Sequence, residues 1–344
     1  MDRITYNRLI RDRHKSRGRK IFDDIKNISR EDFESLGPLK DLLGTWKNEP
    51  SLPGRGWNMI ALPFEPGSFK YRLLVNQYNE TLDFFKVDSA VPNRGINLPE
   101  SGEDPDQFLI ALDYQQSIQQ IDVDDFPESG KRAATGADIH HEPGLWLSMT
   151  DELTSGINLA RLATIPHGNS ALALGKSSPA IAGKPVLPDV NGLPIGVPQE
   201  GIDQPLDPEN PTYLDPYKHY NQTPFKKNDA TGFPGFDPVN PTILLELVNS
   251  DPTIEINSST ELMVTTEIEK AGIVNIPFIE RQADTTDMTS HFWIQEVTNK
   301  RTGKKSMRLQ YLQIVMLDFF PTRDDPNTLI RWPHISINTM EKVS

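Results

Sequence analysis

The chain has 344 residues, a formal net charge of −13 and no cysteine. The acidic balance argues against nucleic acid or anionic lipid as a general partner, and the missing thiols exclude disulfides, thiolate nucleophiles and Cys-ligated metal centres. No apolar run has the length that a membrane span needs. We therefore expect a cytoplasmic protein with neither a nucleic-acid nor a membrane partner.

The first segment, residues 1–36, is a basic N-terminal extension. Eight Lys or Arg lie among its first twenty residues, but no apolar stretch follows that would make it a signal peptide. A solvated helix or a partly disordered extension is the simpler interpretation. A basic arm that contacts an acidic partner is the alternative.

The second segment, residues 37–344, is rich in short β-type stretches separated by turn residues. The stretches 291–297 and 306–319 predict a hairpin, because the polar, Gly-containing sequence 299–305 lies between them. No strand–helix–strand rhythm is present, which argues against a doubly wound α/β fold. The pattern predicts an all-β protein, an antiparallel up-and-down β-barrel. Further strand-like stretches are 68–78, 81–87, 107–120, 145–150, 158–165, 259–269 and 329–340.

One part of this domain, about residues 175–252, is a Pro-rich insertion. It carries 14 of the 29 prolines, and proline removes the donors that a central strand needs. It also holds too many apolar residues for a free linker. We expect an ordered insertion that wraps over the barrel or reaches a neighbouring subunit.

Four short stretches, in chain order, resemble one family. They read LKDLLGTWKNE, IHHEPGLWLSM, LARLATIPHGNSALALG and WPHISINTMEK. They are similar to the nitrobindins, haem-binding barrels of the fatty-acid-binding-protein-like and lipocalin-like type. The second stretch matches the family's His-x-Glu-x-Gly-aromatic-Trp strand through His140, Glu142, Gly144 and Trp146. The chain departs from the family in its length, since the family barrel is roughly half as long.

The resemblance implies a haem b cofactor and an axial ligand for its iron. The family's closing histidine falls on His334, which would bind ferric iron and leave the opposite position open for nitric oxide, peroxynitrite or peroxide. The implied reaction is isomerisation of peroxynitrite to nitrate. A peroxidase-like reaction is an alternative if His140 lies over the iron, because an imidazole can move the proton that such chemistry requires.

The residues themselves support this expectation independently. In the final strand Trp332 and His334 share one face by the two-residue period of a strand. A barrel interior presents such alternate residues to whatever fills it. Ordinary core packing or a structural hydrogen bond is the other interpretation for each candidate. The further cofactor-binding candidates are Trp146, Met316, His167 and His291.

Two other functions stay open at this point. A haem-free barrel could bind or carry an apolar small molecule or lipid, with His334 only orienting it. A metal-dependent enzyme could hold its ion through two or three inward histidines and a carboxylate. Each of these three functions involves a small-molecule ligand. The insertion could also pair two copies of the chain into a homodimer.

Overall fold

The computed structural model describes residues 29–66, 69–96, 105–150, 156–225 and 234–343. Residues 1–28 of the predicted N-terminal extension therefore lie outside the described residues. The strands are β1 (Gly44–Lys47), β2 (Gly56–Pro63), β3 (Tyr71–Asn93), β4 (Gln107–Phe126), β5 (Asp138–Met149), β6 (Leu159–Ile165), β7 (Asn169–Ser177), β8 (Ile181–Ala182), β9 (Ile254–Thr265), β10 (Gly272–Asn275), β11 (Asp284–Asn299), β12 (Lys305–Pro321) and β13 (Leu329–Lys342). The helices are α2 (Arg30–Glu34), α3 (Asp215–Gln222), α4 (Ile243–Asn249) and α5 (Pro277–Gln282), with a 3-10 turn η1 (Gly37–Leu39).

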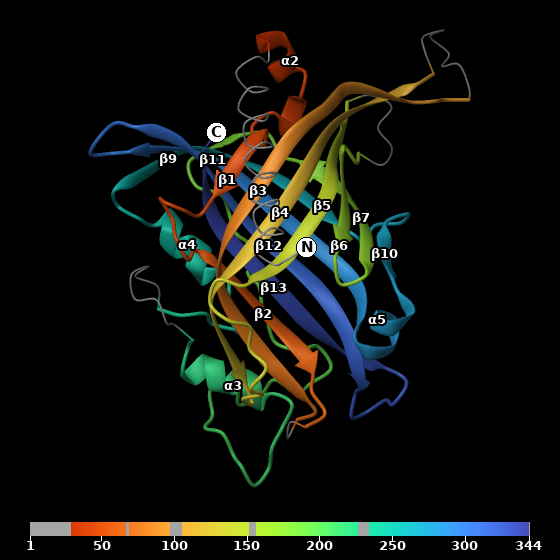
Figure 1. The fold of residues 1–344 in the computed structure, drawn as a ribbon, viewed down its shortest axis with the longest axis vertical. Coiled ribbons are helices and arrows are strands. Elements are labelled where there is room, and N and C mark those ends of the chain that lie inside the picture. The colour runs from red at the N-terminus through yellow and green to blue at the C-terminus, as the bar shows by residue number, and fades with distance from the viewer. Residues whose placement is uncertain (1–28, 67–68, 97–104, 151–155, 226–233, 344) are drawn as a thin grey trace, which may run out of the picture.

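Antiparallel pairing closes these strands into a barrel (Figure 1). Strands β2 to β7 pair in chain order, and β7 pairs with β9. Strands β9, β11, β12 and β13 then pair in that order, and β13 pairs with β2, which closes the barrel. The closed wall has ten strands. This confirms the predicted antiparallel up-and-down barrel, and the β11–β12 pairing confirms the predicted hairpin.

The alternating sequence explains which side chains the barrel encloses. Along β4 the buried positions include Leu112, Tyr114, Gln116, Ile118 and Gln120, every second residue. The same two-residue period holds along β7, where Ala171 and Ala173 are buried and their neighbours face outward. Both alanines belong to the buried core of the barrel.

Closure at the β7–β9 seam depends on a glycine. Gly175 pairs with Val264, and a Cβ atom at Gly175 would lie 1.9 Å from the carbonyl oxygen of Met263. Any side chain there must push the two strands apart. We expect Gly175→Ala to lower the free energy of unfolding by about 1–3 kcal/mol or more, as overpacking does. Urea unfolding measures this, with Lys176→Ala, the exposed neighbour, as the control that should be near neutral.

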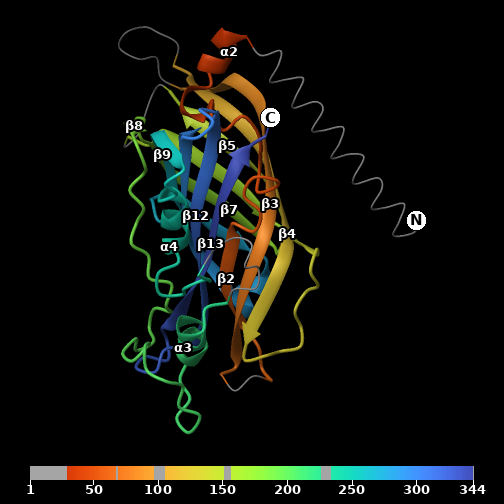
Figure 2. The ribbon, with the colours of Figure 1, turned by 90° about the vertical axis from the view of Figure 1, so that its left-hand side faces the viewer.

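The Pro-rich insertion covers the outside of the barrel (Figure 2). Trp57 on β2 packs against Phe225 and Phe236 with ring centroids 6.0 and 6.3 Å apart. The backbone of Ile195 forms a bridge with Arg331 on β13. Helix α4 lies beside β12, where Gln310 donates a hydrogen bond to the carbonyl of Leu245 in α4. The insertion is therefore ordered against β2, β12 and β13 over its described residues.

Large side chains fill one part of the barrel interior. Tyr114 contacts Phe84, and Phe292 contacts both Trp146 and Tyr311. A second aromatic group, Trp332 with Phe319, Tyr71 and Tyr213, packs near the end of the barrel where β13 begins. Among the described residues, no helix is long and apolar enough to cross a membrane.

Candidate functional site

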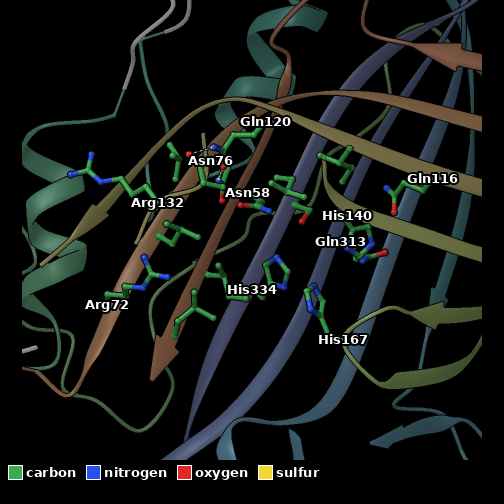
Figure 3. Close-up of a pocket in the computed structure, with 18 of the residues that line it drawn as sticks. Asn58, Arg72, Asn76, Gln116, Gln120, Arg132, His140, His167, Gln313 and His334 are labelled. Atoms are coloured by element: carbon green, nitrogen blue, oxygen red, sulfur yellow. Dashed lines mark hydrogen bonds between the residues drawn. The ribbon is translucent and has the colours of Figure 1, made fainter. Parts of the chain in front are cut away.

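A cavity of about 320 Å³ lies inside the barrel, within the usual range for ligand pockets. Strands β2, β3, β4, β5, β12 and β13 contribute to its wall, together with the turn between β6 and β7 and the loop after β4. Figure 3 shows three histidines, His140, His167 and His334, at one side of it. Its aliphatic lining is Ile60, Leu62, Leu74, Ile118, Val123 and Ile139.

His334 enters this cavity from β13. It pairs with Val315 of β12, and the next residue on its face, Ser336, also lines the cavity. Its Nε2 atom is buried and has no hydrogen-bond partner among the described residues. Burial, together with the nearby His140 and His167, lowers the pKa of His334 to about 3. The imidazole is therefore neutral at physiological pH and presents an unpaired nitrogen.

His140 and His167 meet where the β5–β6 pairing stops. Gly144 of β5 pairs with Ala163 of β6, and the same register continued by four residues would bring His140 opposite His167. The two ring centroids lie 6.0 Å apart. His167 is exposed in the β6–β7 turn, so the cavity reaches solvent on this side.

A buried ion pair holds His140 in place. His140 Nε2 lies 3.3 Å from Glu142 Oε2, and Arg161 Nη2 lies 2.8 Å from Glu142 Oε1. Tyr114 also donates a hydrogen bond to Glu142. Burial alone would raise the pKa of Glu142, but Arg161, His140 and Tyr114 hold it at about 2. Because an ionised carboxylate only accepts hydrogen bonds, Nε2 of His140 must carry the proton of this contact.

Arg161 ties this cluster to the cavity wall. Besides Glu142, it donates to the Tyr114 hydroxyl at 3.1 Å, to Ser290 Oγ at 3.0 Å and to Gln313 Oε1 at 2.7 Å. Gln313 lines the cavity. These contacts use four of the five N–H donors of the buried guanidinium, so Arg161 holds Glu142, Tyr114, Ser290 and Gln313 in place.

Amide side chains also line the cavity. Asn76 donates to Gln120 Oε1 at 2.6 Å, whereas Asn58 Oδ1 is buried without a hydrogen-bond partner among the described residues. Asn58 and His334 lie on neighbouring strands, since Asn58 pairs with Ser336. Two buried polar atoms without partners thus face one cavity, which indicates that a ligand or water completes them.

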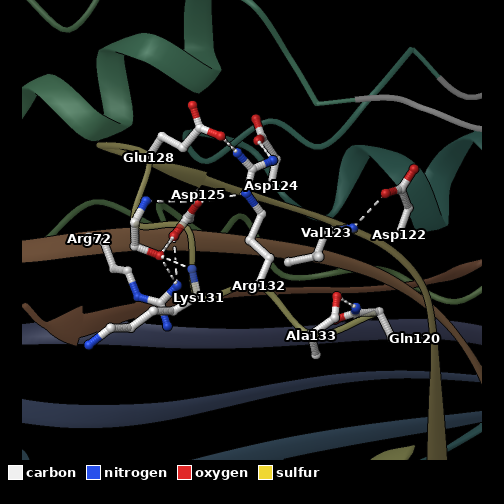
Figure 4. Close-up of polar contacts among 11 residues, drawn as sticks. Arg72, Gln120, Asp122, Val123, Asp124, Asp125, Glu128, Lys131, Arg132 and Ala133 are labelled. Carbon is white, nitrogen blue, oxygen red and sulfur yellow. Dashed lines mark hydrogen bonds and ion pairs between the residues drawn. The ribbon is translucent and has the colours of Figure 1, made fainter. Parts of the chain in front are cut away.

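Three cationic side chains, Arg72, Lys131 and Arg132, stand at the mouth of the cavity (Figures 3 and 4). Arg72 forms an ion pair with Asp125 at 2.6 Å, and Arg132 forms ion pairs with both Asp125 and Asp124 at 2.9 and 2.8 Å. Lys131 instead places its ammonium 5.7 Å from the ring centroid of Phe64. Lys131 and Arg132 are exposed residues, so this is a second opening to solvent.

The other predicted site residues lie outside the cavity lining. Trp332 follows the alternation of β13 but stacks on Phe319 and donates to its carbonyl. Trp146 is buried against Phe292. Met316 of β12 pairs with Pro333 and lies on the opposite face of the strand from the cavity-lining residues Tyr311 and Gln313. His291 is 2.8 Å from Glu261 and stacks on Trp293.

Several site residues were not predicted from the sequence. Arg161 is the most informative, because a charged residue inside the apolar stretch LARLATI signals either an exposed face or a buried ion pair. No local sequence pattern marks Asn58, Gln313 or the three cations at the cavity mouth as site residues. Strand register brings Asn58 and Gln313 beside His334, whereas the loop after β4 brings Lys131 and Arg132 to the cavity.

No protein-family model matches the chain, and no curated protein matches its sequence. The strand pairing establishes a barrel, but a barrel by itself does not identify the nitrobindin family. Within the described ranges, no group of three or more His, Cys, Asp or Glu side chains is arranged to hold a metal ion.

Proposed function

We propose that this protein is a haem-binding β-barrel in which His334 is the axial ligand of a ferric haem b. The observation that carries the proposal is the Nε2 atom of His334, which is buried inside a ligand-sized cavity without a hydrogen-bond partner. Its lowered pKa keeps the imidazole neutral, so that one of its two ring nitrogens is free of a proton, the form in which imidazole binds iron.

The aliphatic part of the lining supports the same proposal. A porphyrin supplies its own equatorial nitrogens, so the protein needs to offer only an axial ligand and an apolar slot. The six aliphatic side chains of the lining supply apolar surface. At the mouth, Arg72 and Arg132 already form ion pairs with Asp125 and Asp124, so Lys131 is the cation that would attract a carboxylate of the ligand. The likeness of WPHISINTMEK to the closing nitrobindin strand adds to this.

When bound, ferric haem supplies a Lewis-acidic iron at which nitric oxide, peroxynitrite or peroxide can bind. The chain's own contribution is the proton chemistry around that position. Glu142 holds the Nε2 proton of His140, which leaves Nδ1 of a neutral His140 as the proton acceptor. We propose isomerisation of peroxynitrite to nitrate as the reaction, with peroxidase-like turnover as the second possibility for the same residues.

Paired titrations of the purified protein with haemin and with metal-free protoporphyrin IX test the proposal. The His334 nitrogen can bind iron, which protoporphyrin IX lacks. We therefore expect stoichiometric haemin binding with a sharp Soret band, and much weaker binding of protoporphyrin IX. Haemin should also raise the unfolding temperature through mass action. Equal binding of both compounds would point to the alternative, a haem-free carrier of apolar molecules that uses only the aliphatic lining. Binding of neither would remove the haem proposal.

A further inference from the structure

Arg308 on β12 is a buried cation whose donors have no acceptor. The residue is 3% exposed, and its Nε and Nη1 atoms lack a hydrogen-bond partner among the described residues. No residue of the described ranges forms an ion pair with it either. An arginine keeps its charge at physiological pH, and a buried charge without a partner is strongly unfavourable. A further group is therefore expected to complete the surroundings of Arg308.

Arg308 lies on the outer face of the barrel, under the Pro-rich insertion. Tyr311 and Gln313 of the same strand line the interior cavity, so the alternate positions Arg308 and Gln310 face outward. Gln310 contacts the carbonyl of Leu245 in α4, which lies beside β12 on this face (Figure 1). The surroundings of Arg308 are thus separate from the cavity that contains His334.

The residue opposite Arg308 supplies a second buried atom without a partner. Gln295 of β11 pairs with Arg308 across the two strands and is 0% exposed. Its Nε2 donates to Gln310 Oε1 at 2.9 Å, whereas its Oε1 accepts no hydrogen bond from any described residue. The orientation of this amide is fixed, because Gln310 uses its own Nε2 for Leu245 and Thr339 and so offers its oxygen to Gln295. Unpartnered donors and an unpartnered acceptor therefore lie side by side.

The carboxylates near Arg308 do not supply the missing acceptor. Asp251, in the loop after α4, accepts hydrogen bonds from the backbone and the hydroxyl of Thr253 at 2.8 and 2.7 Å. Glu341 lies opposite Arg308 on β13, yet neither carboxylate is at ion-pair distance from the guanidinium. Burial lowers the pKa of Arg308, Glu341 and Asp251 oppose this, and the charge of Arg55 adds to it. Two cations close together attract an anion.

We propose that Arg308 and Gln295 form a buried site for a small oxyanion that keeps a proton at neutral pH, the chemistry of hydrogen phosphate. The oxygens of the anion accept hydrogen bonds from the Arg308 guanidinium, and its O–H group donates to Gln295 Oε1. Side chains directly opposite each other on paired strands start about 5 Å apart, a gap that one small ion can span. Arg55 and Asp251 are only half-buried, so solvent reaches the edge of the site.

The bound ion would fasten the insertion to the barrel wall. Gln295 also donates a hydrogen bond to Asn249 Oδ1 of α4 at 3.2 Å. An ion held between Arg308 and Gln295 therefore stabilises the contact of α4 with β11 and β12. This role is independent of the interior cavity and of any haem bound there.

Calorimetric titration of the haem-free protein with inorganic phosphate, near neutral pH and at constant ionic strength, is the first test. We expect saturable binding of phosphate. Sulfate carries no proton at this pH and cannot donate to Gln295, so it should bind about 10-fold or more weakly. If phosphate shows no saturable binding, the proposal fails. Equal affinities for the two ions would overturn the proposed class of ligand.

Arg308→Met tests the location of the site. Methionine keeps much of the side-chain volume and removes the donors, so the affinity for phosphate should fall about 10- to 100-fold. Phosphate should raise the unfolding temperature of the wild type and leave that of the variant unchanged. Lys131→Ala, which removes an exposed cation at the mouth of the interior cavity, is the matched control and should bind phosphate like the wild type.

The stability of Arg308→Met without phosphate gives an independent result. The variant should unfold at a temperature at least as high as the phosphate-free wild type, because it removes a buried charge without a partner. A clearly less stable or unfolded variant would show that the guanidinium has a partner in the native protein, which contradicts the proposal. Phosphate binding that survives Arg308→Met, or that is lost in Lys131→Ala, would contradict it as well.

Discussion

His334→Ala is expected to abolish tight haemin binding. Removing the axial nitrogen should weaken the affinity by ~100-fold or more, which corresponds to ~2.7 kcal/mol of binding free energy. The preference for haemin over metal-free protoporphyrin IX should disappear with it. Added imidazole should restore part of the Soret band, because the truncated side chain leaves room for a free imidazole in the cavity.

The same variant should fold as well as the wild type. In the ligand-free protein Nε2 of His334 has no hydrogen-bond partner among the described residues, so its removal costs no hydrogen bond. We expect the free energy of unfolding to stay within about 1 kcal/mol of wild type. His291→Ala is the matched control, since His291 lies outside the cavity lining against Glu261 and Trp293. Equal loss of haemin in both variants would contradict the assignment of His334.

Arg161→Met is expected to be the most destabilising single change in the barrel interior. Both Arg161 and Glu142 are almost fully buried, at 2% and 1% exposed. Removing the cation leaves an uncompensated buried carboxylate, which typically costs about 3–5 kcal/mol. The double variant Arg161→Met with Glu142→Gln should recover part of this loss, because no net charge is then buried. Urea unfolding of the two single variants and the double variant measures the coupling.

The Arg161 effect should depend on pH. The pKa of Glu142 is lowered from its ordinary 4.5 to about 2, so the ion pair stabilises the fold above pH 4.5 and this contribution is lost as the pH falls toward 2. In Arg161→Met the pKa of Glu142 is no longer held down, and protonation relieves the buried charge. The difference in unfolding free energy between wild type and variant should therefore shrink as the pH falls from 7 toward 3. A constant difference over that range would show that Glu142 is not ionised in the native protein.

Much of the fold could be predicted because a barrel strand repeats every two residues. The β11–β12 hairpin shows this best, since its alternation and its Gly-containing turn are local features of the sequence. The Pro-rich insertion was recognisable by composition, but its contacts were not. Trp57 packs against Phe225 and Phe236 through tertiary structure that no local pattern encodes.

The candidate site was predictable only where a motif or an alternation marked it. His334, His140 and His167 do line one cavity. Trp332 shares its strand face with His334, yet it stands at the strand's start, where the insertion residue Tyr213 packs on it. His291 is a histidine in an apolar strand like His334, and only strand register separates their surroundings.

A crystal structure of the haemin-loaded protein would show directly whether His334 binds the iron. We expect a haem inside the barrel with Nε2 of His334 at bonding distance from the iron and a haem carboxylate near Lys131. His140 should remain hydrogen-bonded to Glu142 on the cavity wall. A haem bound elsewhere, or an iron ligated by His140, His167 or His291 in place of His334, would contradict it.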